Sequence, residues 1–113
     1  MAVFGRRRRR PGTTRAATTD DLVHLDRFAA TRSGVEAYLE PRTTVTETTI
    51  VLVAADGEWT RRRIDGPQAA AEFARDRRMP LYDAGNMGYP RRMREWSARR
   101  KADGDTARPG PSV

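Results

Sequence analysis

One predicted strand combines a tryptophan with three arginines, residue types that are well suited to binding nucleic acid. Side chains alternate along Trp59-Thr60-Arg61-Arg62-Arg63, so Trp59, Arg61 and Arg63 share one face of the strand. A tryptophan ring stacks on a base, and guanidinium groups bind the neighbouring phosphates. The alternative is an edge strand on which arginine stems cover a half-buried tryptophan and their charges block pairing with another sheet.

Basic side chains also gather toward both ends of the sequence. Residues 1–18 contain six arginines and no acidic residue, residues 19–88 contain nine arginines and twelve acidic residues, and residues 89–113 contain seven basic and three acidic residues. The ends therefore carry +6 and +4 and the central part carries −3, which together give the formal net charge of +7. Near the beginning, the candidate phosphate contacts are Arg6, Arg7, Arg8, Arg9 and Arg10. In a predicted last helix they are Arg91, Arg92, Arg94, Arg99, Arg100 and Lys101.

The two basic ends lead to a first functional hypothesis. Contacts between basic side chains and phosphates give salt-dependent binding that is largely independent of base sequence. We therefore predict a non-enzymatic accessory protein whose ends contact nucleic acid, with ribosomal RNA as the first candidate, while its domain docks on a partner. Among the 22 basic residues, however, only Lys101 is a lysine. Codon usage in a GC-rich genome is a second explanation for so strong a preference for arginine.

Two other classes of function remain open. One is a protein-interaction or regulatory module whose basic ends keep it in solution. That hypothesis requires an exposed patch made of apolar side chains near the last helix: Tyr82, Met87, Tyr89, Met93 and Trp96. The other is a small enzyme or ligand-binding domain, which requires a pocket where Tyr38 and Glu36 or Glu40 meet the arginines of residues 58–64.

Few residues suit catalysis or metal binding. The sequence has no cysteine and a single histidine, which excludes disulfides, thiol nucleophiles, Cys-based metal sites and ordinary multi-histidine centres. It contains no phosphate-loop or dinucleotide-binding motif, so we predict neither a cofactor nor a metal. His24 follows Asp20 and Asp21 by about one helical turn, but no nucleophile motif accompanies it. We interpret it as a helix histidine that is exposed to solvent or lies at the boundary between the core and the solvent.

Three glutamates on neighbouring predicted strands form another candidate cluster: Glu36, Glu40 and Glu47. Paired carboxylates serve as general acid and base in some enzymes. Salt bridges across the strands to the arginines of residues 61–63 explain the glutamates with fewer assumptions. We therefore predict salt bridges rather than a catalytic pair.

The first half of the chain predicts a helix followed by three strands. The helix begins at Thr19, whose hydroxyl caps it, and ends at Ser33-Gly34. Strands are predicted over residues 35–40, 43–54 and 58–64, because apolar or β-branched residues alternate or cluster there. Val35, Ala37 and Leu39 share one face of the first strand, and Asp56-Gly57 predicts a hairpin turn between the last two.

The second half predicts a helix opened by Asp65-Gly66-Pro67 and ended by Pro80. Leu81-Tyr82 is compatible with a short fourth strand, residues 83–90 are predicted as a loop, and the last helix spans about residues 90–101. The fold class is thus α+β: a three-stranded antiparallel meander packed with two or three helices, in the order α-β-β-β-α-(β)-α. Residues 19–101 form one small domain between a disordered basic arm (1–18) and a disordered tail (102–113).

No apolar run approaches the roughly 20 residues that span a bilayer, and no apolar stretch follows the basic run as it does in a signal peptide. We therefore expect a cytoplasmic protein without a membrane span.

Several stretches of the sequence resemble a family of small uncharacterised actinobacterial proteins. They are VEAYLEPRTTVTETTI at residues 35–50, DGEWTRRR at 56–63, PLYD at 80–83 and GYPRRMR at 88–94. The similarity covers about residues 19–100. Members are described as hypothetical proteins, occasionally as oxidoreductases, and the resemblance implies no particular catalytic residue.

Overall fold

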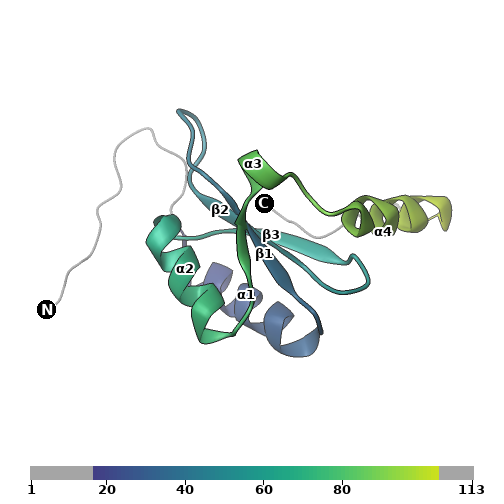
Figure 1. Cartoon of the computed structure of the whole chain (residues 1–113), viewed down its shortest axis with the longest axis horizontal. Coiled ribbons are helices and arrows are strands. Elements are labelled where there is room, and N and C mark those ends of the chain that lie inside the picture. Colours follow the sequence, from purple (N-terminus) through teal and green to yellow (C-terminus); the bar gives the residue numbers. More distant parts are fainter. Residues whose placement is uncertain (1–16, 105–113) are drawn as a thin grey trace, which may run out of the picture.

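Three strands that follow one another in the chain form an antiparallel meander, and a short fourth strand completes a mixed sheet (Figure 1). This computed structural model describes residues 17–104. Its elements are α1 (Thr19–Thr31), β1 (Glu36–Glu40), β2 (Thr49–Val53), β3 (Trp59–Arg63), α2 (Gly66–Asp76), β4 (Leu81–Asp83), α3 (Ala84–Met87) and α4 (Arg91–Ala102). The predicted α+β class and the fourth strand are confirmed. The predicted arm and tail lie largely outside the described residues.

The strand order is β3-β2-β1-β4, with antiparallel pairing except between β1 and β4, which run parallel. The meander makes β1 and β3 point the same way. Helix α2 then carries the chain from β3 to the opposite edge of the sheet, so β4 enters alongside β1 in the same direction. β2 is shorter than predicted, because residues 43–48 form a loop in which the Thr43 and Thr46 hydroxyls bond to each other and Thr43 also accepts backbone N–H groups.

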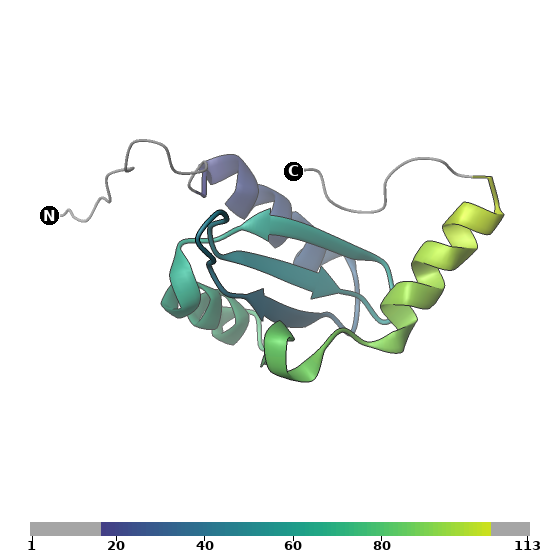
Figure 2. The same ribbon diagram turned by 90° about the horizontal axis from the view of Figure 1, so that it is seen from above.

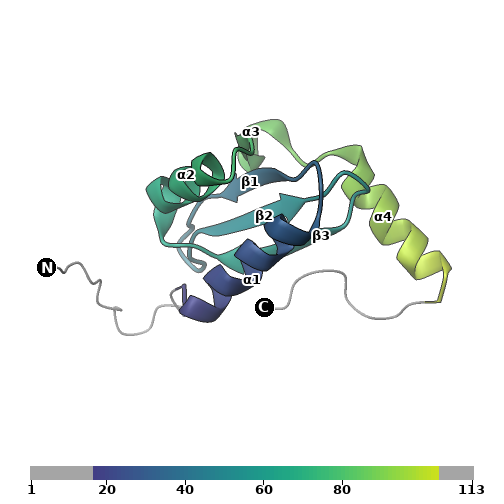
Figure 3. The same cartoon turned by 90° about the horizontal axis from the view of Figure 1, so that it is seen from below.

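Helices α1 and α2 cover one face of the sheet (Figure 3). Their apolar stripes, which include Leu25, Phe28 and Phe73, pack on the strand residues that alternate toward that face. These strand residues include Val35, Ala37 and Leu39, as predicted. Burial of fully enclosed side chains such as Ile50 and Leu52 stabilises this core by about 1.5–3 kcal/mol each before entropy is counted.

The ends of three helical segments differ from the predictions. The N-cap of α1 is Thr18 and not Thr19: the Thr18 hydroxyl accepts from the Asp21 N–H, and the Asp21 carboxylate accepts from the Thr18 N–H, which completes a capping box. Helix α2 ends at Asp76, before Pro80, because Arg78 adopts a left-handed conformation (φ 56°). Residues 84–87, predicted as loop, form the short α3, since the Asp83 carboxylate accepts from the N–H groups of Gly85 and Asn86.

The second face of the sheet holds a smaller apolar cluster. Tyr38, Val51, Val53 and Met93 are buried there, and Trp59, Tyr82 and Tyr89 pack against them. In Figure 2 this face is turned toward the viewer, with α1 and α2 behind it and α3 and α4 along its border. Among residues 17–104, no helix is long and apolar enough to cross a membrane.

Candidate functional site

Helix α4 stands at one end of the sheet, against the β2–β3 hairpin (Figure 2). The two segments approach so closely that a Cβ on Gly57 would lie 2.1 Å from the Arg92 carbonyl oxygen and 2.9 Å from the Trp96 Cβ. A glycine is required for a second reason, because φ at residue 57 is +97°. Helix α4 therefore packs directly on the predicted turn glycine, and we call this contact the seat of α4.

Polar contacts reinforce this seat. Arg92 donates from Nε to the Ala54 carbonyl (2.9 Å) and from Nη2 to Glu36 Oε1 (3.0 Å). Trp59 donates from Nε1 to the Ser97 hydroxyl at 3.0 Å. Together with buried Met93, these contacts hold one side of α4 to the sheet. No sequence signal pointed to Ser97, since its partner is 38 residues away.

Two more basic side chains of α4 face the body of the protein. Arg99 donates to the Asp56 carbonyl (3.1 Å), and the Arg100 guanidinium lies 4.8 Å from the centre of the Trp96 ring. Of the six predicted phosphate contacts in this helix, Arg92, Arg99 and Arg100 thus bind within the protein.

The opposite side of α4 carries an outward stripe, which we define as Arg91, Arg94, Ala98 and Lys101. These residues follow one another at spacings of three, four and three, so they line one face of the helix, and all four are exposed. Glu95 is exposed beside them. With a rise of about 1.5 Å per residue, the two end cations stand about 15 Å apart along the axis.

Trp59, Arg61 and Arg63 share one face of β3 as predicted, but they are not equally available to contact a ligand. Trp59, Arg61 and Arg63 lie on the sheet face opposite α1, as the alternation predicts. Arg61 donates from Nε and Nη2 to Glu40 at 2.8 and 3.0 Å, in a bidentate ion pair. Arg63 is half-buried.

Glu40 is the centre of a polar network on this face. Besides Arg61, it accepts hydrogen bonds from the Thr49 hydroxyl (2.5 Å) and from the Tyr89 hydroxyl. Burial favours a higher pKa for the Glu40 carboxyl, but the bonds from Arg61, Thr49 and Tyr89 outweigh it and lower that pKa. Burial and the bond to Glu40 raise the pKa of Tyr89 to about 12.

The predicted salt bridges to arginines of β3 are confirmed for Glu40, and they are wrong for Glu36 and for Glu47, which has no ion pair within residues 17–104. Glu36 pairs with Arg92 of α4 instead of an arginine of β3, and it also accepts from the Tyr38 hydroxyl at 3.0 Å. Burial and this hydrogen bond raise the pKa of Tyr38 to about 12. The prediction failed because α4 packs against the β2–β3 hairpin, which brings the Arg92 guanidinium to Glu36.

The predicted partner-binding residues are spread over different degrees of burial. Met93 is buried on the inner side of α4, and Tyr82, Tyr89 and Trp96 are partly buried. The ring centroids of Tyr82 and Tyr89 lie 5.3 and 5.8 Å from that of Tyr38. Met87 of α3 is 63% exposed. Only Met87 of this set therefore presents most of its surface to solvent.

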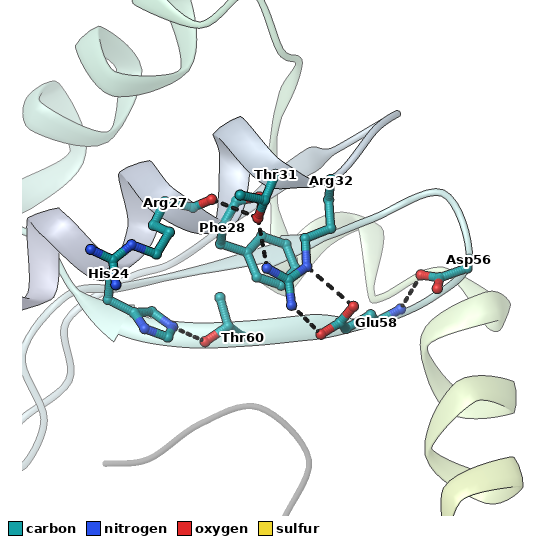
Figure 4. A network of polar contacts seen from close by, with 8 residues as sticks. All are labelled: His24, Arg27, Phe28, Thr31, Arg32, Asp56, Glu58 and Thr60. Carbon is teal, nitrogen blue, oxygen red and sulfur yellow. Dashed lines mark hydrogen bonds and ion pairs between the residues drawn. The ribbon is translucent and has the colours of Figure 1, made fainter.

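His24 belongs to a network that fastens α1 to β3 (Figure 4). Its Nε2 shares a hydrogen bond of 2.6 Å with the Thr60 hydroxyl, and Arg62 Nη2 lies 3.4 Å from Nδ1. Burial and then the charge of Arg62 lower the pKa of His24. Further along α1, Arg32 binds Glu58 through two hydrogen bonds of 3.2 and 2.6 Å. Because Thr60 is buried, the geometry suits attachment of the helix better than nucleophilic chemistry.

Residues 17–104 contain no group of three or more histidine, cysteine, aspartate or glutamate side chains placed to hold a metal ion. The predicted contacts of residues 6–10 lie outside the described part of the chain. Comparison of the sequence with models of known protein families, with curated proteins and with solved structures found no match.

Proposed function

We propose that the protein is a non-enzymatic accessory protein of the cytoplasm that binds nucleic acid through the outward stripe of α4 and the arginines of residues 6–10. Ribosomal RNA is the first candidate. The observation that carries the proposal is that α4 is held firmly on one side, while Arg91, Arg94 and Lys101 project from the other. A helix fixed in this way presents its cations without the loss of backbone freedom that a flexible segment suffers on binding.

The sheet face is a weaker candidate for the same task. Arg61 is neutralised by Glu40, and the Trp59 N–H is occupied by Ser97. The outward cations of α4 have no such partner among residues 17–104, apart from a long contact of 3.5 Å from Arg94 to the Tyr89 carbonyl. Phosphate binding at α4 therefore disrupts no ion pair of the fold.

The test measures RNA and DNA binding by the full chain at increasing salt concentration. Fluorescence anisotropy of a labelled RNA hairpin and of a labelled DNA duplex reports the binding. Each phosphate contact adds about 0.7–0.9 to the slope of log affinity against log salt. The variant Arg91→Gln/Arg94→Gln/Lys101→Gln should reduce that slope by about 2–3. Replacing Arg6 to Arg10 by glutamine should reduce it further.

A matched control changes the same charge elsewhere. Arg27, Arg42 and Arg75 are exposed and lie on α1, the β1–β2 loop and α2. The variant Arg27→Gln/Arg42→Gln/Arg75→Gln should keep the slope of the unmodified protein. An equal loss in both triple variants would reduce the effect to net charge, and a binding curve insensitive to salt would exclude phosphate recognition altogether.

A second candidate function, docking on a protein partner, rests on exposed Met87 of α3, a segment that lies between the half-buried Tyr82 and Tyr89 in the sequence. An exposed methionine provides an adaptable apolar contact. Partners captured from a nuclease-treated lysate should be lost with Met87→Glu and retained with Val45→Glu, which changes another exposed apolar residue, on the β1–β2 loop. Retention of the same partners by Met87→Glu would contradict this candidate.

A further inference from the structure

A pocket of about 490 Å³ lies at the end of the sheet where β1 and β3 finish and β2 begins. The loop of residues 41–48 forms one wall, and the start of α3 with Tyr89 forms another. Its lining also includes Glu40, Thr49 and the three arginines of residues 61–63. The volume falls in the range of small-molecule sites. α4 touches the sheet at its other end, at the β2–β3 hairpin, so this pocket is separate from the outward stripe.

Two of the three carboxylates at the pocket are already satisfied by the protein. Glu40 accepts from Arg61, Thr49 and Tyr89. Asp21 is almost fully buried, accepts from both the backbone and hydroxyl of Thr18, and lies 3.6 Å from Arg62. Neither group is available to neutralise a further cation.

Arg63 differs from its two neighbours. Its Cα pairs with that of Thr49, and Thr49 in turn pairs with Glu40, so the three residues form one row across the sheet. Glu40 nevertheless reaches diagonally to Arg61 and not along this row to Arg63. Within the described part of the chain Arg63 has no ion pair or hydrogen bond from its guanidinium. A half-buried guanidinium is thus left at the pocket beside Arg61, which binds Glu40 through Nε and Nη2 and also interacts with Tyr89.

We propose that this pocket binds a small organic oxyanion. Its carboxylate or phosphate group pairs with the Arg63 guanidinium, next to the positive charge of Arg61, and its apolar part lies against Pro41, Ala84 and the Tyr89 ring. Arginine forks suit planar oxyanions, and such charge-assisted hydrogen bonds are stronger than neutral ones. Because Arg61 is held by Glu40 and Glu40 by Tyr89, the surroundings of Arg63 are positioned before the ligand arrives.

Glu47 is the one carboxylate lining the pocket that has no ion pair within residues 17–104 to offset its repulsion of an anion. It is half-buried on the loop wall, and its carboxylate has no hydrogen bond or ion pair within residues 17–104. It therefore limits affinity for an anion, and it is also the group that would bind if the pocket preferred a cation. This makes Glu47 a second, independent position at which to test the sign of the ligand's charge.

The experiment is a titration of the ¹⁵N-labelled full chain with four probes of similar shape, namely benzoate, phenyl phosphate, benzamide and benzylamine, and with inorganic phosphate. Benzoate or phenyl phosphate should shift the amide signals of residues 41–49, 61–63 and 84–89, and should bind about tenfold more tightly than benzamide. The better of the two identifies the head group. Inorganic phosphate should bind more weakly than phenyl phosphate, because it lacks the apolar part.

Three variants complete the test. Arg63→Gln should abolish the preference for benzoate over benzamide, whereas Arg75→Gln on α2 should leave it intact. Glu47→Gln should strengthen benzoate binding about two- to fivefold, since it removes a like charge. This variant keeps the test valid if Arg63→Gln impairs folding, which circular dichroism would reveal.

Tighter binding of benzylamine than of benzoate, equal binding of benzoate and benzamide, or absence of shifts at the pocket would each overturn the proposal. So would an unchanged preference in Arg63→Gln. The result is independent of the proposed function, because nucleic-acid binding is measured with α4 variants that leave the pocket residues untouched.

Discussion

The carbonyl oxygen of Arg92 lies 2.1 Å from the position that a Cβ on Gly57 would occupy. No side chain fits between the hairpin and the first turn of α4, because the nearest atom belongs to the backbone and cannot rotate away. The position of the basic helix relative to the sheet therefore depends on one glycine.

Gly57→Ala should destabilise the protein by about 2–4 kcal/mol, because it combines a left-handed backbone conformation with a collision. Gly66→Ala is the matched control: its φ of +94° is nearly that of Gly57 (+97°), but a Cβ there meets nothing within 4 Å. Urea unfolding of both variants separates strain from collision. Equal losses would mean that close packing of α4 contributes nothing.

Thr18→Ala should lower the free energy of unfolding by about 1 kcal/mol, because the Thr18 hydroxyl accepts the N–H of Asp21 in the capping box. Thr19→Ala, one residue later and inside α1, should have a much smaller effect. Thermal unfolding of the two variants checks this. A larger loss of stability for Thr19→Ala would mean that Thr19, the cap predicted from the sequence, caps α1 instead of Thr18.

Glu40→Gln should remove the charge of the ion pair with Arg61 and weaken the bond from Tyr89. Burial raises the pKa of Tyr89 first, and the bond to Glu40 raises it further, to about 12. The variant should therefore titrate Tyr89 at lower pH than the unmodified protein. Ultraviolet absorbance of the three tyrosines measures the change.

Glu36→Gln is the control for this titration, since Glu36 raises the pKa of Tyr38 and not that of Tyr89. A specific tyrosine ring signal, followed by NMR, identifies which residue moves. Identical titration curves for Glu40→Gln and the unmodified protein would mean that Glu40 does not raise the pKa of Tyr89.

Stability should fall as the pH drops below about 6.5, the ordinary pKa of histidine. Burial and the charge of Arg62 lower the pKa of His24 in the folded protein, so the unfolded chain binds the proton more readily. Protonation also removes Nδ1 as the acceptor for Arg62. Between pH 7.5 and 5.5, unfolding measurements on His24→Gln should show a shallower decline than the unmodified protein.

A second decline belongs to Glu40, whose lowered pKa makes its contribution disappear only below about pH 4.5. The two windows are separate, so a profile of His24→Gln that declines between pH 7.5 and 5.5 as steeply as that of the unmodified protein would assign the loss to other groups.

Local features of the chain determined the elements. Alternation along β1 placed Val35, Ala37 and Leu39 on the buried face, and Asp56-Gly57 marked the hairpin, because both depend on residues a few positions apart. The same alternation placed Trp59, Arg61 and Arg63 together. It also allowed a salt bridge between Glu40 and β3, which neighbouring strands bring within reach.

Contacts between distant segments depended on the tertiary structure. The crossover through α2 made β4 parallel to β1. The packing of α4 on Gly57 turned Arg92, Arg99 and Arg100 toward the protein and left Arg91, Arg94 and Lys101 outside. The same packing gave Glu36 an ion-pair partner 56 residues away. Arginines that look equivalent in the sequence thus became anchors, ion-pair partners or available cations. The reason is physical. The alternation of side chains along a strand is set by local chain geometry, whereas the charge available at a surface depends on which segments pack beside it.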